Sequence, residues 1–241
     1  MPTALMPDHR TSAQVLAERV RLAIQAGVLT PWYELPLVEL AARYNLRTSA
    51  LALALHGLVA DGLLSVHTTV AVVTPLSAAE LISVQNLRAR LVPVLLERAC
   101  GRFTPDALDR LEEHLSTMDP DVVGLLDPSE WGPRIRQFLL QLLTPDATRT
   151  EQLFVRELFV STARYQALGW RQITEGGRAT GTGLAVRRSH IATAHTLLDT
   201  FRTGDPRSIR EIATRSDATI RTVGEASLIP AHTVGRRRVA P

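Results

Sequence analysis

The sequence predicts a mainly α-helical protein, in which an N-terminal winged helix-turn-helix domain precedes a C-terminal all-α antiparallel helical bundle. Three observations indicate this fold class. Two short helical repeats of apolar residues flank a turn at 45–47. Two β-prone runs, 63–66 and 70–74, follow directly. From residue 78 onwards the apolar pattern is helical almost throughout, and an antiparallel bundle is the simplest way to bury such faces.

The first helix is expected after a flexible arm, residues 1–10. Thr11 or Ser12 can cap it, with Gln14 in the reciprocal position of a capping box, and Gly27 ends it. Trp32, in the connector that follows, is expected to cover the helix junction. The buried stripe of the helix is predicted to contain Val15, Leu16, Val20, Ala23 and Ile24.

The helix-turn-helix and its wing complete the first domain, 11–76. Asn45 suits a left-handed position in the turn between the two helices, and Gly62 suits the C-terminal end of the second. The wing tip is the short segment 67–69. Residues expected on the buried sides of the two helices are Leu37, Leu40, Ala41, Tyr44, Leu51, Leu55, Leu58 and Val59.

The second domain, 77–223, is predicted to be entirely helical. Ser77 can cap its first helix, with Glu80 three residues later. Residues 170–182 are expected to form a polar, glycine-rich loop, and 224–241 a disordered basic tail. The predicted helices lie near 78–100, 105–118, 129–143, 147–169, 183–203 and 207–222.

Composition restricts the class of protein. A chain of 241 residues suits one large domain or two modest ones, each able to bury a core. Its single cysteine, Cys100, excludes an internal disulfide and fits a reducing compartment. Residues 1–10 lack the apolar core of a signal peptide, and no apolar run approaches the ~20 residues of a membrane helix. We therefore expect a cytoplasmic protein without a membrane partner.

The positive charge is unevenly distributed. All basic residues are arginine, and the net charge is +3. Residues 1–75 hold five arginines and five acidic residues, whereas residues 202–241 hold eight arginines and four acidic residues. The surplus thus lies at the opposite end of the chain from the helix-turn-helix, so net charge alone does not predict DNA binding.

The pattern of apolar positions resembles a known family. Segments 34–46 and 60–64, with the helix through Leu55 between them, resemble the winged helix-turn-helix of GntR regulators. Segments 74–80 and 87–93 are similar to the start of the all-helical effector domain, of FCD type, of the FadR subfamily. The resemblance extends over about residues 13–218. It implies a homodimeric transcription regulator that binds duplex DNA and senses a small molecule.

The sequence departs from the family at the DNA-contact positions. The family's arginines fall on Val38, Thr48 and Ala52, and its glutamate falls on Leu53. Guanine is read by a bidentate donor, and neutralised phosphates provide most of the sequence-independent affinity, so these changes weaken the expected interface. The remaining candidates for DNA contact are Arg43, Arg47, Thr48, Ser49, His56 and His67. The alternative is a winged helix that no longer binds DNA, with Leu53 packed against the effector domain or a second subunit.

The family's metal ligands are also absent. An Asp and three His fall on Ile135, Leu139, Ala194 and Ser216. His190 and His195, the nearest substitutes, are about 140° apart around a helix and cannot readily share an ion. We therefore predict no metal and no other cofactor.

Without a metal, the domain resembles family members that bind an organic effector directly. Arg88 matches the family arginine of the first effector helix and could pair with a carboxylate or phosphate. The polar neighbours proposed on inward turns are Gln85, Arg134, Gln137, Gln141 and His190. The alternative is that the arginines lie on the surface and Gln137 and Gln141 form an exposed ridge.

No nucleophile elbow, metalloprotease motif or dinucleotide motif is present, so no catalytic residue is predicted. Cys100 lies at a helix end beside Arg98 and Arg102, which would favour a thiolate.

The leading hypothesis is a DNA-binding regulator that senses a small organic anion. The alternative is a degenerate relative that acts as a ligand-binding or partner-binding protein, or as an enzyme that uses the helical-domain pocket.

Overall fold

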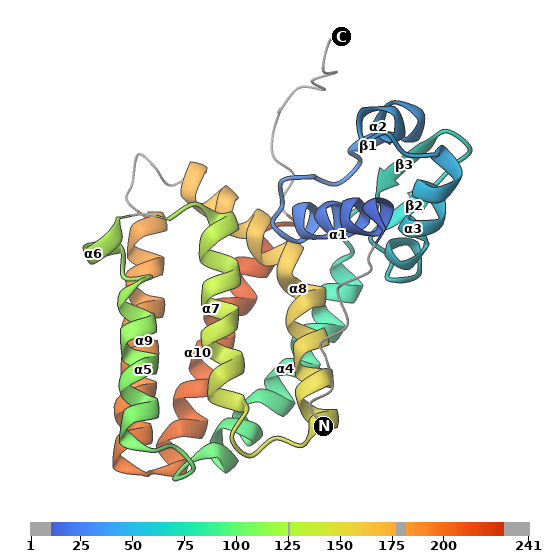
Figure 1. Ribbon diagram of the computed structural model, residues 1–241. Coiled ribbons are helices and arrows are strands. Elements are labelled where there is room, and N and C mark those ends of the chain that lie inside the picture. Colours follow the sequence, from blue (N-terminus) through green and yellow to red (C-terminus); the bar gives the residue numbers. More distant parts are fainter. Residues whose placement is uncertain (1–10, 125, 177–181, 229–241) are drawn as a thin grey trace, which may run out of the picture. The chain divides into compact units, whose positions relative to one another are not determined.

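The structure, a computed structural model, describes residues 11–124, 126–176 and 182–228 (Figure 1). The chain divides into two compact units, residues 1–76 and 77–241. No helix in the described ranges is long and apolar enough to cross a membrane. The predicted arm 1–10 and most of the predicted tail lie outside the described residues.

The first unit consists of three helices and a small antiparallel sheet (Figure 1). Strand β3 lies between the other two strands, and its Ala71 is paired with Leu35 on one side and with Val66 on the other. The elements are α1 (Ser12–Gln25), β1 (Glu34–Pro36), α2 (Leu37–Arg43), α3 (Thr48–Ala60), β2 (Leu64–Val66) and β3 (Val70–Val73). The predicted winged helix-turn-helix is therefore confirmed.

Local signals fix the ends of these helices. Thr11 and Gln14 form the predicted capping box at the start of α1. Asn45, in the turn between α2 and α3, has φ 53°, and Gly62, after α3, has φ 66°. Both lie in the left-handed region for which Asn and Gly are suited.

Some predictions for this unit were wrong. Val15 is 40 % exposed, because the inward stripe of α1 passes through Ala13 and Leu16 instead. Tyr44 is 43 % exposed, since α2 ends one residue before it. Trp32 is 67 % exposed and covers no helix junction. Strand β1 was missed: it is three residues long and forms only because β3 is available as its partner.

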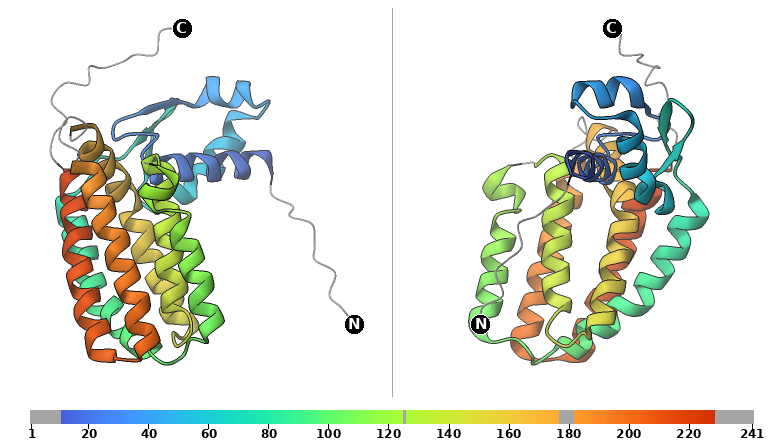
Figure 2. Two further views of the ribbon diagram at one scale, coloured as in Figure 1. Left: turned by 90° about the vertical axis from the view of Figure 1, so that its left-hand side faces the viewer. Right: turned by 45° about the vertical axis from the view of Figure 1, so that its right-hand side comes forward.

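The second unit is an antiparallel bundle. Its elements are α4 (Ala78–Ala99), α5 (Pro105–Ser116), α6 (Pro120–Val123), α7 (Pro128–Leu143), α8 (Arg149–Gly176), α9 (Thr182–Thr203) and α10 (Pro206–Ala226). Figure 2 shows α5, α7, α8, α9 and α10 side by side, with α4 inclined to them. Helix α10 packs against α4, α8 and α9. The core contains Leu96, Leu115, Phe138 and Leu198.

The six long helices of this unit confirm the predicted ones, with corrected ends. Helix α8 continues to Gly176, so residues 170–176 are not the predicted loop; Trp170, only 3 % exposed, anchors this extension in the core. Helix α10 continues to Ala226, three residues into the predicted tail. The short helix α6 was not predicted. The middle of the predicted loop, 177–181, lies outside the described residues.

An exposed ion-pair cluster joins the end of α4 to the start of α8. Arg98 donates to Asp146 at 3.1 Å and to Glu151 at 2.7 Å, and the Thr148 N–H also donates to Glu151. Hydrogen bonds from Arg98 and Thr148 lower the pKa of Glu151 to about 2.

This cluster predicts a loss of local stability in acid. Because the folded-state pKa of Glu151 lies below its ordinary value of 4.5, its carboxylate favours the folded state above pH 4.5. That contribution is lost as the pH falls from 4.5 towards 2. Carbon-detected NMR titration should give a low pKa for Glu151. In Arg98→Gln the pKa should be higher, but still below the ordinary value, because the hydrogen bonds from Thr148 remain. The same pKa in both proteins would contradict the prediction.

Candidate functional site

Helix α3 carries the candidate nucleic-acid interface of the first unit. Arg47 occupies its N-cap position, no side chain caps the helix, and no acidic residue lies in its first turn. The N-terminal N–H groups of α3 therefore have no side-chain acceptor, and a helix N-terminus attracts anions such as phosphate. Arg43, at the end of α2, and Arg47 are both exposed and form no ion pair within the described residues.

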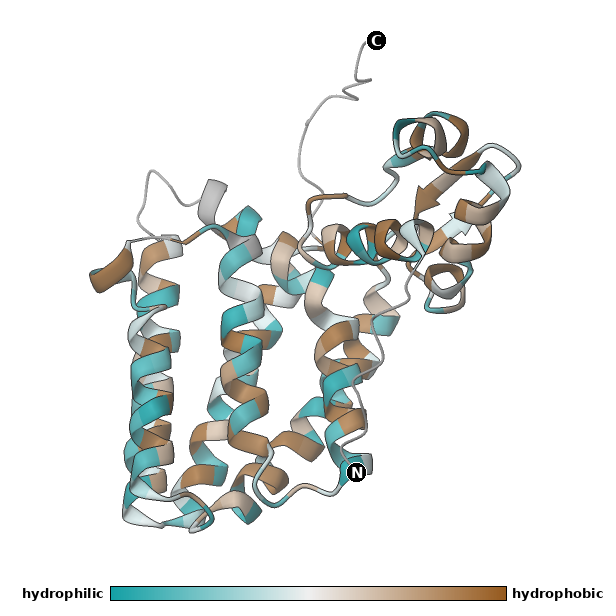
Figure 3. Cartoon of the chain, in the orientation of Figure 1, coloured by the Kyte–Doolittle hydropathy of each residue, from teal (hydrophilic) through white to brown (hydrophobic). Residues whose placement is uncertain are grey.

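The rest of α3 presents a neutral face. Ser49, Leu53 and His56 recur at positions i, i+4 and i+7 and are all exposed, with Leu53 at 76 %. Thr48 is half-buried. Hydrophobic and near-neutral colours dominate this helix in Figure 3. The face can contact thymine methyl groups and phosphate, but α3 holds no guanidinium or ammonium group for guanine.

The wing supplies one further predicted residue. His67 is exposed at the tip, where its backbone exchanges hydrogen bonds with Val70. The structure thus places the predicted Arg47, Thr48 and Ser49 at the N-terminal end of α3 and Arg43 at the end of α2, with His56 farther along α3 and His67 on the wing.

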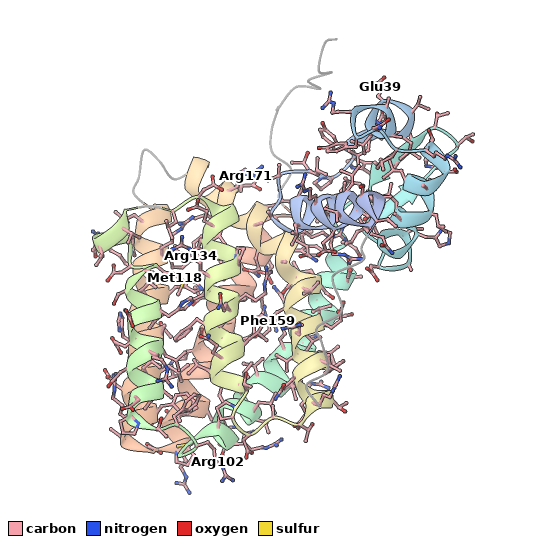
Figure 4. All side chains as sticks on the ribbon, in the orientation of Figure 1. Glu39, Arg102, Met118, Arg134, Phe159 and Arg171 are labelled. Atoms are coloured by element: carbon pink, nitrogen blue, oxygen red, sulfur yellow. The ribbon has the colours of Figure 1, made fainter. Side chains whose placement is uncertain are left out.

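In the second unit, Arg88 of α4 is buried inside the bundle, only 3 % exposed. Its Nη1 donates to Thr162 Oγ1 at 3.5 Å, and its guanidinium carbon lies 4.6 Å from the ring centroid of Phe159, labelled in Figure 4. Nε has no hydrogen-bond partner. Burial lowers the pKa of Arg88 to about 10, while attraction by Asp217 of α10 raises it.

Gln85 lies one turn before Arg88 and is also buried. Its Nε2 donates to the Arg221 carbonyl at 3.4 Å, and its Oε1 has no partner. Burial raises the pKa of Asp217, with Arg88 and Arg221 opposing that effect. The bundle thus brings together a buried cation, a carboxyl group and an unpaired amide oxygen. Of these, the guanidinium of Arg88 can bind an anion, whereas the two oxygen-bearing groups accept hydrogen bonds from donors.

The other predicted effector residues do not join Arg88. Gln137 and Gln141 are exposed. The alternative of an exposed ridge is therefore confirmed, and their placement on inward turns was wrong. The inward positions of α7 are taken by Trp131, Phe138 and Leu142 instead. Arg134, labelled in Figure 4, donates to the Thr117 carbonyl at 3.0 Å.

His190 belongs to a second buried cluster, formed by α7, α8 and α9. Its ring lies 5.2 Å from that of Trp170, and its Nδ1 is 3.2 Å from the Val186 carbonyl oxygen. Burial lowers its pKa, and the charge of Arg187 lowers it further.

Arg187 was missed by the sequence analysis. It is fully buried, and its guanidinium carbon lies 5.0 Å from the ring centroid of Trp131 and 5.4 Å from that of Trp170. One signal could have revealed it. The buried stripe of α9 follows helical spacing and includes this arginine: it runs through Arg187, Ile191, Ala194 and Leu198.

The described residues contain no group of three or more His, Cys, Asp or Glu side chains that could hold a metal ion.

Cys100 gives no sign of activation. Burial raises the pKa of its thiol, and Asp205 raises it further. The neighbouring Arg98 does not favour a thiolate here, because it is engaged by Asp146 and Glu151.

Comparison with solved structures identifies proteins of similar fold. Escherichia coli McbR/YncC has a TM-score of 0.68 at 17 % identity and covers 90 % of this chain and 98 % of its own. A GntR transcriptional regulator from Rhodococcus sp. RHA1 has a TM-score of 0.64 at 17 % identity, covering 87 % and 98 %. Lar, which controls the expression of the Listeria monocytogenes agr system, has a TM-score of 0.58 at 16 % identity, covering 90 % and 98 %.

At these identities the comparison shows a shared fold. No protein-family model matches the chain. No curated protein matches it either.

Proposed function

We propose that this protein is a transcription regulator of the GntR family, of the FadR subfamily with an FCD-type effector domain. It binds duplex DNA through α2, α3 and the wing, and senses a small organic anion in its helical unit. A homodimer in the cytoplasm would place two winged helices on one operator. The observation that carries the proposal is the association of a winged helix with an all-helical unit, an arrangement shared with McbR/YncC and the Rhodococcus regulator.

The end of α3 is the proposed contact with the DNA backbone. Arg43 and Arg47 approach a phosphate together with the uncapped N–H groups of α3. Ser49 and His56 lie along the same helix and His67 on the wing, where they can add neutral contacts. This interface carries few charges, so its affinity should depend less steeply on salt than that of an arginine-rich recognition helix.

Arg88 is the proposed anion-binding residue of the helical unit. A carboxylate that reached it would neutralise a buried charge and accept from its unpaired Nε. Gln85 and Thr162 are polar neighbours on either side. Because Asp217 also approaches, ligand binding would alter how α4 is held against α10, and an altered bundle can shift the balance between two spacings of the winged helices.

DNA binding predicts a measurable salt dependence. In a fluorescence-anisotropy titration of the full chain with a randomised duplex pool, Arg47→Ala and Arg43→Ala should each reduce the slope of log K against log salt by about 1. Arg90→Ala is the matched control, because it removes an exposed arginine from α4. Selection from the pool should enrich one sequence, at least about 1,000-fold over the unselected pool.

Two results would contradict this function: an equal reduction of the salt slope in Arg47→Ala and Arg90→Ala, or no detectable dependence of duplex binding on salt. Those results would favour the second candidate, a partner-binding winged helix. The observation in its favour is the neutral, partly apolar face of α3, where Leu53 is exposed and no arginine is present. A ligand-binding or catalytic use of the helical unit remains compatible with that candidate.

A further inference from the structure

The buried cluster around Arg187 has donors without acceptors. Its Nη1 donates to the Leu126 carbonyl, but Nε and Nη2 have no hydrogen-bond partner. The indole Nε1 of Trp131, in the same cluster, also lacks one. Buried polar groups are almost always paired, and each exception calls for an explanation. Here all three exceptions are N–H donors.

The two open positions on Arg187 have a defined geometry. In a guanidinium group, the Nε–H and Nη2–H bonds lie on the same edge and point in parallel. This edge is the fork that binds a carboxylate with two hydrogen bonds. The backbone carbonyl of Leu126 occupies the other side, at Nη1. The free edge is therefore the one suited to a bidentate anion.

The surroundings hold the guanidinium in place. Trp131 and Trp170 both contact it through their rings, and the two indoles pack edge to face, with centroids 5.9 Å apart. Cation–π contacts of this kind restrict the orientation of the arginine without using its N–H groups. Trp131 is 1 % exposed and Trp170 3 %, so the fork is fixed in a low-dielectric environment.

The charge at this position also lacks a full counterion. Burial lowers the pKa of Arg187 to about 10, and Asp127 opposes that effect. Neither open donor bonds to a carboxylate of the described residues. A water molecule could accept the hydrogen bonds, but it would leave the charge uncompensated. An anion satisfies both requirements at once.

We propose that Arg187, Trp131 and Trp170 form a binding site for a small carboxylate. The carboxylate oxygens accept from Nε and Nη2 of Arg187, and Trp131 Nε1 supplies the third donor. The site is distinct from that of Arg88: Phe159 contacts Arg88 and Trp170 contacts Arg187, eleven residues apart on α8, or about 16 Å along a helix. The site goes beyond the proposed function and does not depend on DNA binding.

The chain contains three tryptophans, so its indole N–H signals report on this site directly. We would record ¹H–¹⁵N spectra of the full chain during titration with acetate, citrate or inorganic phosphate, at an ionic strength held constant with sodium chloride. The signals are assigned from Trp→Phe variants at positions 32, 131 and 170. Acetate or citrate should shift the Trp131 indole signal saturably, and the exposed Trp32 should not respond. A response to phosphate alone, an equal response to chloride, or none to about 10 mM carboxylate would overturn the proposal.

Substitutions then assign the response to Arg187. Arg187→Met retains an apolar stem and removes the fork, and should abolish the shift. Arg90→Met, which removes an exposed arginine from α4, is the control and should retain the shift. Arg187→Lys keeps the charge without the fork and should weaken binding about 10-fold. If Arg187→Met does not fold, Arg187→Lys alone tests whether Arg187 binds the carboxylate. Unchanged affinity in Arg187→Lys, or an equal loss of the response in Arg187→Met and Arg90→Met, would contradict the site.

Discussion

Gly169→Ala is expected to destabilise the helical unit by about 3 kcal/mol, at the upper end of overpacking effects. A Cβ atom at Gly169 would lie 1.8 Å from the carbonyl oxygen of Val223 and 2.8 Å from its carbonyl carbon. Both are backbone atoms of α10, so no side chain can rotate to make room. Helices α8 and α10 would have to separate, and the packing around Val223, which is 1 % exposed, would be lost.

Gly57→Ala provides the control. Gly57 lies inside α3, and a Cβ atom there would meet one atom within 4 Å, Nη2 of Arg21, at an ordinary contact distance of 3.8 Å. Alanine is the better helix former, so this variant should gain about 0.5–1 kcal/mol. Denaturant unfolding followed by circular dichroism, with the m-value compared between variants, would measure both effects. Equal stability of the two variants would show that α8 and α10 do not approach closely at Gly169.

Leu51→Ala is expected to destabilise the winged-helix unit by about 3 kcal/mol, because removing a buried leucine leaves a cavity. Leu51 lies on the inward face of α3 and is fully buried, among residues that include Leu55 and Leu37. A loss of this size is a large fraction of the stability of a unit this small, ~0.1 kcal/mol per residue. The winged-helix unit should therefore stay folded but open more often, while the helical unit keeps its own core.

Leu53→Ala is the control for this experiment. Leu53 lies on the same helix but is 76 % exposed, so its truncation should change the free energy of unfolding by less than about 0.5 kcal/mol. Native-state hydrogen exchange would resolve the two units: only amides of the first unit should lose protection in Leu51→Ala. The prediction would be contradicted if amides throughout the chain lost protection in Leu51→Ala, or if Leu51→Ala and Leu53→Ala lost equal protection.

Much of the fold could be predicted because its signals are local. The capping box of Thr11 and Gln14, the left-handed Asn45 and the cap at Ser77 each involve residues within three positions of one another. Strand β1 had no such signal, since its pairing with β3 spans more than thirty residues. The end of α8 was misplaced for a similar reason: burial of Trp170 outweighs the polar, glycine-rich sequence that follows.

The candidate sites were less predictable than the fold. The exposed position of His56 follows from helical spacing and agrees with the structure. Gln137 and Gln141 did not lie inward, because the same spacing fits an inward stripe or an exposed one until a neighbouring helix is in place. Arg187 was overlooked because a charged residue is normally taken to mark the end of a buried helical stripe. Here two indole rings enclose its guanidinium group.

The sequence by itself determined the class of fold, the capped starts of α1 and α4 and the absence of basic side chains on α3, because each depends on residue type and near neighbours. Only the tertiary structure decided which polar groups are buried without partners. Whether Arg88 and Arg187 find an acceptor depends on helices brought together from distant parts of the chain. Burial in a low-dielectric core raises the free-energy cost of leaving a donor of a charged arginine without a partner.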